Sequence, residues 1–146
     1  MDNSFYMKEK ADYFLQELKK WAEFQNHING AAVVGSFARG DFHLNSDVDL
    51  VIISMNQEKT IQCIMSEFMP DSIGEHRLEH WGPFVTSLRI FYSNELEVEY
   101  SVATNAWVME PLDPGTKNVA ENGFKILLDK EAVFSSVIKH LNEKSK

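Results

Sequence analysis

The sequence predicts an α+β protein in which a mixed β-sheet of about five strands has helices packed mainly on one side. Three observations support this fold class. Segments with helical spacing of apolar residues alternate with short runs of β-branched and aromatic residues. Two of these runs are separated by only two residues, as in a β-hairpin. The length of 146 residues suits a single domain, residues 1–146, with its own hydrophobic core.

Periodicity and turn residues define the elements of the first part of the chain. Residues 4–25 place apolar side chains on one helical stripe, and Gly30 is available for the left-handed turn that follows. The run AAVV at 31–34 has the composition of a short buried strand. Residues 36–41 are expected to form a helical turn, and residues 42–46 a loop.

The run DVDLVII at 47–53 is the next predicted strand. Side chains alternate between the faces of a strand, so one face should be wholly apolar while the other begins with two carboxylates. The apolar face holds Val48, Leu50 and Ile52, and the other holds Asp47, Asp49, Val51 and Ile53. Residues 57–69 then show helical spacing that ends before Pro70.

The second half of the chain predicts a hairpin followed by a strand and a helix. Residues 84–93 and 96–104 are rich in β-branched and aromatic side chains and form the two arms of the hairpin. Residues 111–116, PLDPGT, have turn chemistry. Residues 123–129 predict a last strand, and residues 131–142 a closing helix.

Composition and charge predict a cytoplasmic protein without a membrane span. Cys63 is the only cysteine, so no internal disulfide can form, which fits a reducing compartment. The first residues are polar and acidic, unlike a signal peptide, and no apolar run approaches the ~20 residues that span a bilayer. The net charge of −8 argues against a nucleic-acid partner, but it allows a nucleotide whose charge metal ions neutralise.

Asp47 and Asp49 stand two residues apart on the predicted strand, so both carboxylates emerge on one face. Two such charges repel unless a cation lies between them. Carboxylate oxygens are the ligands that Mg²⁺ prefers, usually one or two from the protein together with phosphate oxygens and waters. The pair therefore predicts a magnesium site. The alternative is that Asp47 caps a turn while Asp49 lies on an exposed edge.

Gly35 and Ser36 follow the buried strand and open the short helical turn. Backbone N–H groups at a helix start attract anions, and glycine allows a phosphate to approach closely. The Ser36 hydroxyl adds a donor, and Arg39, one turn on, is placed to reach the same anion. The three residues predict a nucleotide phosphate site, with pairing of Arg39 to Asp41 or Asp47 as the alternative.

The segment GSFARGDFHLNSDVDL strongly resembles the signature of the nucleotidyltransferase superfamily related to DNA polymerase β. Its small members include minimal nucleotidyltransferases and antibiotic-modifying adenylyltransferases. The resemblance covers residues 31–53 strongly and residues 84–103 moderately, and it implies the palm-like fold of the superfamily. The residues that match at the usual spacing are Gly35, Ser36, Ala38, Arg39, Gly40, Ser46, Asp47, Asp49 and Leu50.

This resemblance implies a third carboxylate on a nearby strand. The run LEVEYSVA offers Glu97 and Glu99 on one strand face. The hydrophobic residues after Glu99 resemble those that follow the family's third acid, which favours Glu99. Glu97 is the reserve ligand, a general base for the acceptor hydroxyl, or only an outward-facing charge. The family usually has Asp at the third position, so Glu carries its oxygens one methylene further from the backbone.

The resemblance implies a Mg²⁺-dependent enzyme that transfers a nucleoside monophosphate, most simply AMP from ATP, to a hydroxyl of a small-molecule or protein acceptor. Asp47, Asp49 and Glu99 would bind two Mg²⁺ ions, while Gly35 and Ser36 hold the phosphates of the nucleoside triphosphate. Two other functions stay open: an antitoxin-type minimal nucleotidyltransferase that modifies a partner toxin, and a nucleotide-binding module without turnover. A chain of this length has no room for the helical second domain of larger relatives, so a homodimer that completes the acceptor site is also open.

Overall fold

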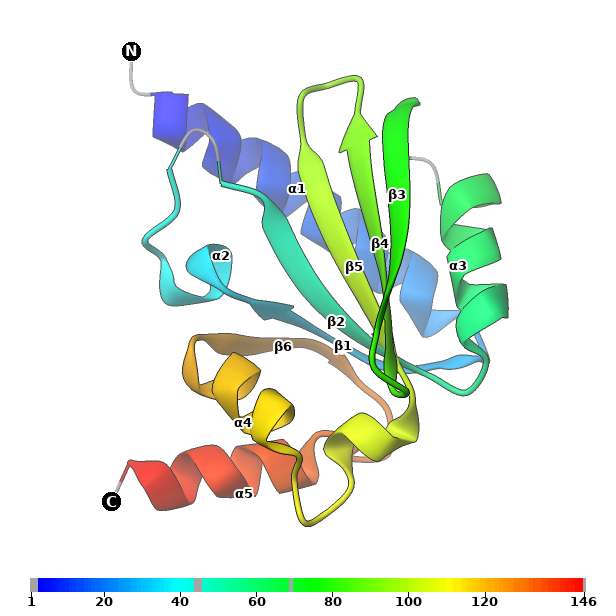
Figure 1. The fold of residues 1–146 in the computed structure, drawn as a ribbon. Helices are drawn as coiled ribbons and strands as arrows, with labels where there is room; N and C mark the ends of the chain where they lie inside the picture. The colour runs from blue at the N-terminus through cyan, green and yellow to red at the C-terminus, as the bar shows by residue number, and fades with distance from the viewer. Residues whose placement is uncertain (1–2, 44–45, 69, 146) are drawn as a thin grey trace.

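A computed structural model of the chain describes residues 3–43, 46–68 and 70–145. Within these ranges the chain forms one mixed sheet flanked by helices (Figure 1). The helices are α1 (Asn3–Glu23), α2 (Ser36–Arg39), α3 (Gln57–Ser66), the 3₁₀ helix η1 (Asn105–Val108), α4 (Pro114–Glu121) and α5 (Ser135–Lys144). The strands are β1 (Ile28–Val34), β2 (Val48–Ser54), β3 (Ile73–Trp81), β4 (Val85–Tyr92), β5 (Glu97–Ala103) and β6 (Phe124–Asp129). None of the helices in these ranges has the length and apolarity needed to cross a membrane.

The six strands form one sheet in the order β3-β4-β5-β2-β1-β6. β2 and β5 are paired in parallel, while every other neighbouring pair is antiparallel. β2 therefore lies inside the sheet, between β1 and β5. The parallel register sets Asp49 of β2 directly beside Glu99 of β5. This register brings together acidic residues that are far apart in the sequence.

Helices cover both faces of the sheet. On one face, α1 and α3 pack on a buried apolar cluster that includes Leu18 and Leu50. On the other face, η1, α4 and α5 pack on a second cluster that includes Val51 and Trp107. Figure 1 shows α1 running behind the strands and α4 lying beside α5. β2 contributes alternate side chains to both clusters, as the alternation at 47–53 predicts.

The predicted α+β class with a mixed sheet is confirmed, and two details differ from the expectation. The sheet has a sixth strand, β3, and helices lie on both faces rather than mainly on one. β3 is a mostly exposed edge strand, and its sequence IGEHRLEHW lacks the apolar alternation of a half-buried strand. The predicted loop at 42–46 and helix at 57–69 include residues 44, 45 and 69, which lie outside the described ranges.

Candidate active site

Three carboxylates from β2 and β5 meet on the sheet face that α4 and α5 cover. One oxygen each of Asp47, Asp49 and Glu99 lies within 4.8 Å of the other two. We call these three residues the acid cluster. Oxygen ligands at this spacing suit a hard divalent cation such as Mg²⁺. The chemistry of the donor set therefore fits the metal that the sequence predicts.

Asp49 is the carboxylate whose charge is least favourable. Burial, the nearby charges of Asp47 and Glu99, and a hydrogen bond with Asp47 together raise the pKa of Asp49 to about 7. The attraction of Arg89 opposes this shift without cancelling it. Crowded like charges in a partly buried position are typical of sites that bind a cation or perform chemistry, because a folded protein otherwise avoids them.

Arg89 supplies positive charge to the acid cluster. Its Nη1 donates to Asp47 Oδ2 at 2.9 Å and lies 3.4 Å from Glu97 Oε1, while its Nη2 donates to Glu99 Oε2. Although burial disfavours the guanidinium, the hydrogen bond with Asp47 and the charges of Glu99, Asp47 and Glu97 raise the pKa of Arg89. Ser87, also on β4, donates to Glu99 Oε1 at 3.2 Å.

The sequence interpretation missed Arg89. Its signal is that Arg89 is the only charged residue in the otherwise apolar and hydroxylic run FVTSLRIFYS. The partner of such a charge depends on which strand lies beside it. In the structure, the antiparallel register of β4 with β5 sets Arg89 opposite Glu99. That pairing could not be derived from the local pattern.

Gly35 brings the backbone against the acid cluster. Its φ is 72° and its ψ is −148°, a conformation that is essentially restricted to glycine. A Cβ atom at this position would lie 2.8 Å from Asp49 Oδ2. The predicted glycine is thus required both by its backbone conformation and by the close approach of the Asp49 carboxylate.

The other predicted site residues lie around this centre. Ser36 begins α2 next to Gly35, and its carbonyl accepts from the N–H groups of Gly40 and Asp41. Arg39 donates from Nε to the Asp41 carboxylate at 3.0 Å and from Nη1 to the Asn122 carbonyl at 2.6 Å. The contact with Asn122 links α2 to the end of α4. The contact with Asp41 is the pairing considered as an alternative above.

Glu97 and Glu99 have different surroundings, although both project from β5 toward the same side. Glu99 belongs to the acid cluster and lines the adjoining cleft. Glu97 lies outside the three-residue group, and its ion pair is with Arg89. The geometry therefore favours Glu99 over Glu97 as the third candidate ligand.

A cleft of about 720 Å³ opens beside the acid cluster. Its lining includes Asp49 and Glu99 of the acid cluster, Trp81 and Phe84 of the β3–β4 hairpin, and Asp113, which directly precedes α4. The volume is in the range of small-molecule binding sites. None of the described residues that line this cleft is Lys, Arg or His.

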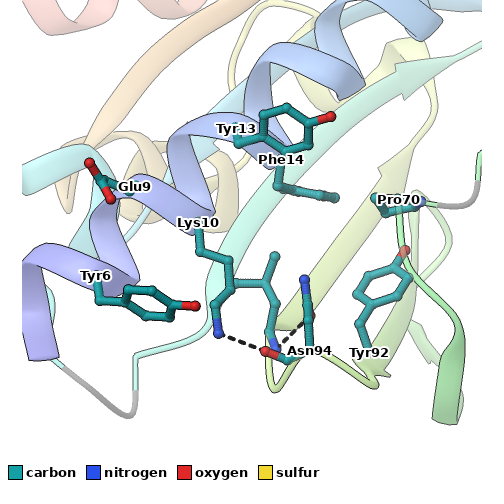
Figure 2. A pocket seen from close by; sticks show the side chains of 9 residues that line it. Tyr6, Glu9, Lys10, Tyr13, Phe14, Pro70, Tyr92 and Asn94 are labelled. Atoms are coloured by element: carbon teal, nitrogen blue, oxygen red, sulfur yellow. Dashed lines mark hydrogen bonds between the residues drawn. The ribbon is translucent and has the colours of Figure 1, made fainter.

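A smaller hollow of about 310 Å³ lies on the α1 face of the sheet, away from the acid cluster. Figure 2 shows that Tyr6, Lys10 and Tyr13 of α1 border it on one side and Tyr92 and Asn94 on the other. Lys10 Nζ donates to the Asn94 carbonyl at 2.6 Å, which ties α1 to the β4–β5 turn. This contact holds two elements together and is a structural one. The larger cleft, which adjoins the acid cluster, is therefore the candidate active site.

The chain was also compared with known protein families, curated sequences and solved structures. The sequence profile of a family described as the nucleotidyltransferase domain matches residues 13–127. Among solved structures, the chain is similar to one described as a structure of the GLD-2/RNP-8 complex, with a TM-score of 0.44 and 19% sequence identity. That similarity covers 73% of this chain and 41% of the other. A search of curated protein sequences found no match.

Proposed function

This chain belongs to the nucleotidyltransferase domain family, and we propose that it transfers AMP from ATP, with Mg²⁺, to a hydroxyl group of a small-molecule or protein acceptor. The observation that carries the proposal is the convergence of Asp47, Asp49 and Glu99 beside a cleft of substrate size. A nucleotide-binding module without turnover would gain nothing from carboxylates that destabilise one another. Burial first, and then the charges of Asp47 and Glu99, raise the pKa of Asp49, so these like charges oppose one another in the cluster.

Asp47, Asp49 and Glu99 are the residues that would hold the Mg²⁺, for which we propose two ions. When bound, Mg²⁺ would neutralise phosphate charge and make the acceptor hydroxyl easier to deprotonate. The residues of the chain would then position the reactants. Gly35 and Ser36, in the turn beside Asp49, would contact the phosphates. Arg39 would contact them from α2.

In the proposed reaction, the acceptor oxygen forms a bond to the α-phosphorus of ATP. The bond from that phosphorus to the bridging oxygen breaks, and diphosphate leaves with the electron pair. The hydroxyl proton passes to a carboxylate, for which Glu99 is the better candidate because it lines the cleft and Glu97 does not. Positioning and charge neutralisation would supply most of the rate enhancement.

The lining of the cleft supports an acceptor that carries positive charge. Its charged residues are the acids Asp49, Glu99 and Asp113, and no basic side chain lies among the lining residues described. Trp81 and Phe84 are 60% and 37% exposed, so their ring faces are available to a cation. Hydroxyl compounds that also bear amines therefore fit the cleft better than neutral or anionic ones.

The test is diphosphate release from ATP, GTP, CTP and UTP with Mg²⁺. The acceptors would be aminoglycosides, lincosamides, neutral sugars matched in size, and a cell lysate as a source of proteins. We expect release that requires ATP and an amine-bearing acceptor, and that is lost in Asp47→Asn/Asp49→Asn protein. Asp12→Asn serves as the matched control, because Asp12 is an exposed α1 residue whose ion pair is with Lys8.

The alternatives give different results in the same experiment. If only the lysate supports release, the acceptor is a protein, and co-purification of that protein with the chain would favour the antitoxin-type function. If ATP binds but no acceptor supports release, the chain is a nucleotide-binding module. If neither nucleotide nor Mg²⁺ binds, the proposed function is wrong.

A further inference from the structure

We propose that Arg89 is a built-in counter-ion that occupies the acid cluster in the metal-free protein and moves to Glu97 when a divalent cation binds. Arg89 would thereby act as a positioning residue. Without metal it neutralises the acid cluster, and with metal bound it neutralises Glu97 instead. The inference rests on the proposed function in one respect, namely that the acid cluster binds a metal ion.

The first argument is that Arg89 occupies the carboxylates that a metal ion would need. It hydrogen bonds to Asp47 and Glu99, which are two of the three members of the acid cluster. The side chains of Arg89, Asp47 and Glu99 are only 30%, 28% and 21% exposed, so water screens these pairs less than it screens surface pairs. Hydrogen bonds between such ions are among the strongest in proteins.

The second argument is that movement of Arg89 relieves the repulsion between its guanidinium and a bound metal ion. A guanidinium stays protonated in proteins, so Arg89 cannot lose its charge as a metal ion arrives. Its pKa is in fact raised further here by the surrounding acids. Arg89 contacts one oxygen each of Asp47 and Glu99, and a metal ion on the same two carboxylates would be close enough to repel it. We therefore expect Arg89 to release at least one of these carboxylates.

The third argument is that Glu97 stands ready to receive the guanidinium. Its Oε1 already lies 3.4 Å from Arg89 Nη1, and it is not a member of the acid cluster. Glu97 and Glu99 are two residues apart on one face of β5, a separation of about 7 Å along the strand. Arg89 lies opposite Glu99 in the β4–β5 register, so Glu97 is its diagonal neighbour. A change of side-chain rotamer spans this distance without any change in the sheet.

The test measures Mg²⁺ and Mn²⁺ binding by calorimetry, without nucleotide, in the native protein and in variants. Arg89→Gln should bind the metal about tenfold more tightly, because the competing cation is gone and a close charge pair is of this scale. Glu97→Gln should bind several-fold more weakly, because Arg89 loses its alternative partner. In the double variant Arg89→Gln/Glu97→Gln the guanidinium is already absent, so replacing Glu97 should change metal affinity only through the loss of its own negative charge. The effects of the two substitutions should therefore be strongly non-additive.

The matched control is Arg77→Gln. Arg77 lies opposite Arg89 in the β3–β4 register but belongs to the exposed edge strand, so this variant removes the same charge one strand further from the cluster. It should change metal affinity little. If Arg89→Gln fails to fold, Arg89→Lys replaces it. Lysine keeps the charge but cannot bridge the carboxylates with a planar fork, and a smaller gain in affinity is expected.

A second readout uses the native protein alone. The chain has three arginines, Arg39, Arg77 and Arg89, whose Nε–H groups can be followed by NMR during a Mg²⁺ titration. The signal of Arg89 should shift with the same midpoint as the calorimetric binding, while the other two stay in place. A stationary Arg89 signal would overturn the proposal.

The outcomes separate this proposal from the proposed function. If the native protein binds Mg²⁺ but Arg89→Gln binds it equally or more weakly, Arg89 supports the metal ligands rather than competing with the metal, and the counter-ion proposal is wrong. If the native protein and Arg89→Gln both fail to bind metal, the metal site itself is wrong, and the counter-ion proposal fails with it.

Discussion

At Gly35 the backbone passes within contact distance of the Asp49 carboxylate, in a conformation that other residues rarely adopt. Gly35→Ala should lower the free energy of unfolding by about 1–3 kcal/mol, because it adds strain at positive φ. It should also weaken Mg²⁺ binding and nucleotide transfer at least about tenfold, because the new Cβ displaces Asp49. Thermal unfolding, calorimetry and diphosphate release measure these effects.

The matched control for Gly35→Ala is Gly40→Ala. Gly40 also has a positive φ, 86°, but a Cβ there meets nothing within 4 Å. Its substitution should cost about 1 kcal/mol of stability with a much smaller loss of metal binding. Equal losses of metal binding in the two variants would show that backbone strain, rather than the contact with Asp49, accounts for the requirement at Gly35.

Asp49 is the residue where stability and the proposed function oppose each other. Its pKa is raised from 3.8 to about 7, so the folded protein holds a proton there more tightly than the unfolded chain does. Its favourable contribution to stability is therefore present below pH 4 and is lost as the pH rises through about 7. In metal-free protein at pH 8, Asp49→Asn should raise the melting temperature by roughly 3 °C or more. With Mg²⁺ and ATP, the same variant should lose transfer activity.

The comparison for Asp49→Asn is made at pH 5 and at pH 8 in the presence of a chelator. The gain in melting temperature should be larger at pH 8, where the native carboxylate is ionised. A loss of stability at pH 8 would mean that the attraction of Arg89 for the Asp49 carboxylate outweighs burial and the repulsion by Asp47 and Glu99.

Among the elements, α3 is joined to the start of β1 through a buried histidine. His27 Nδ1 lies 2.6 Å from Thr60 Oγ1, and Thr60 is hydrogen bonded in turn to Ser54. Burial and the charges of Lys59 and Lys130 lower the pKa of His27, against the opposing effect of Glu67. The fold therefore favours a neutral imidazole at the connection between α3 and the sheet.

This connection predicts a pH dependence of stability. The unfolded chain takes up a proton at His27 more readily than the folded protein, so stability should fall as the pH drops through about 6.5 and level off below the pKa of the folded state. His27→Gln should have a smaller slope of melting temperature between pH 8 and pH 5. His76→Gln, on the exposed strand β3, should keep the native slope. Equal slopes in the native and His27→Gln proteins would contradict the prediction.

At the level of elements, the sequence predicts the helices and strands whose pattern lies within a single segment. The apolar stripe of α1, the alternation in β2 and the short separation of β4 and β5 each lie within one segment, so the sequence indicated them. β3 was missed because an edge strand exposed on both faces needs no apolar alternation. Its existence depends on pairing with β4, which is a tertiary interaction.

The residues of the candidate site likewise fall into those that one segment contains and those that strand pairing brings together. Gly35, Ser36, Asp47 and Asp49 fall in one short segment, so the local pattern together with its resemblance to the family signature predicts a phosphate and metal site. The preference for Glu99 over Glu97 rests in the structure on the β2–β5 register, and the contacts of Arg89 depend on the β4–β5 register. Strand registers join segments that are distant in the sequence, which is why one sequence could suggest candidates on β5 but not their partners.

In the molecule as a whole, the two apolar clusters hold the centre of the sheet and leave one edge free. β1 and β2 supply buried side chains to both clusters, whereas β3 is paired only on one side and is largely exposed. The acid cluster lies on the rigid central strands, while the hairpin that carries Trp81 and Phe84 borders the cleft from the exposed edge. The fold thus places the acid cluster at the centre of the sheet, and it forms one wall of the cleft from the β3–β4 hairpin, which has fewer packing contacts.

This difference predicts the pattern of amide hydrogen exchange. Amides of β2 should exchange at least about a hundredfold more slowly than those of β3, because β2 opens only with both clusters whereas β3 can separate from β4 alone. Adding Mg²⁺ and a non-hydrolysable ATP analogue should slow exchange in the turn at Gly35 and Ser36 and along α4. The hollow beside α1 should be unaffected. Asp47→Asn/Asp49→Asn protein should show the native ranking of strands without the ligand effect, since the fold remains while the proposed metal site is lost. Protection by the ligand that centres on α1, or a β3 that exchanges as slowly as β2, would contradict this division between a slowly exchanging candidate site and a looser edge.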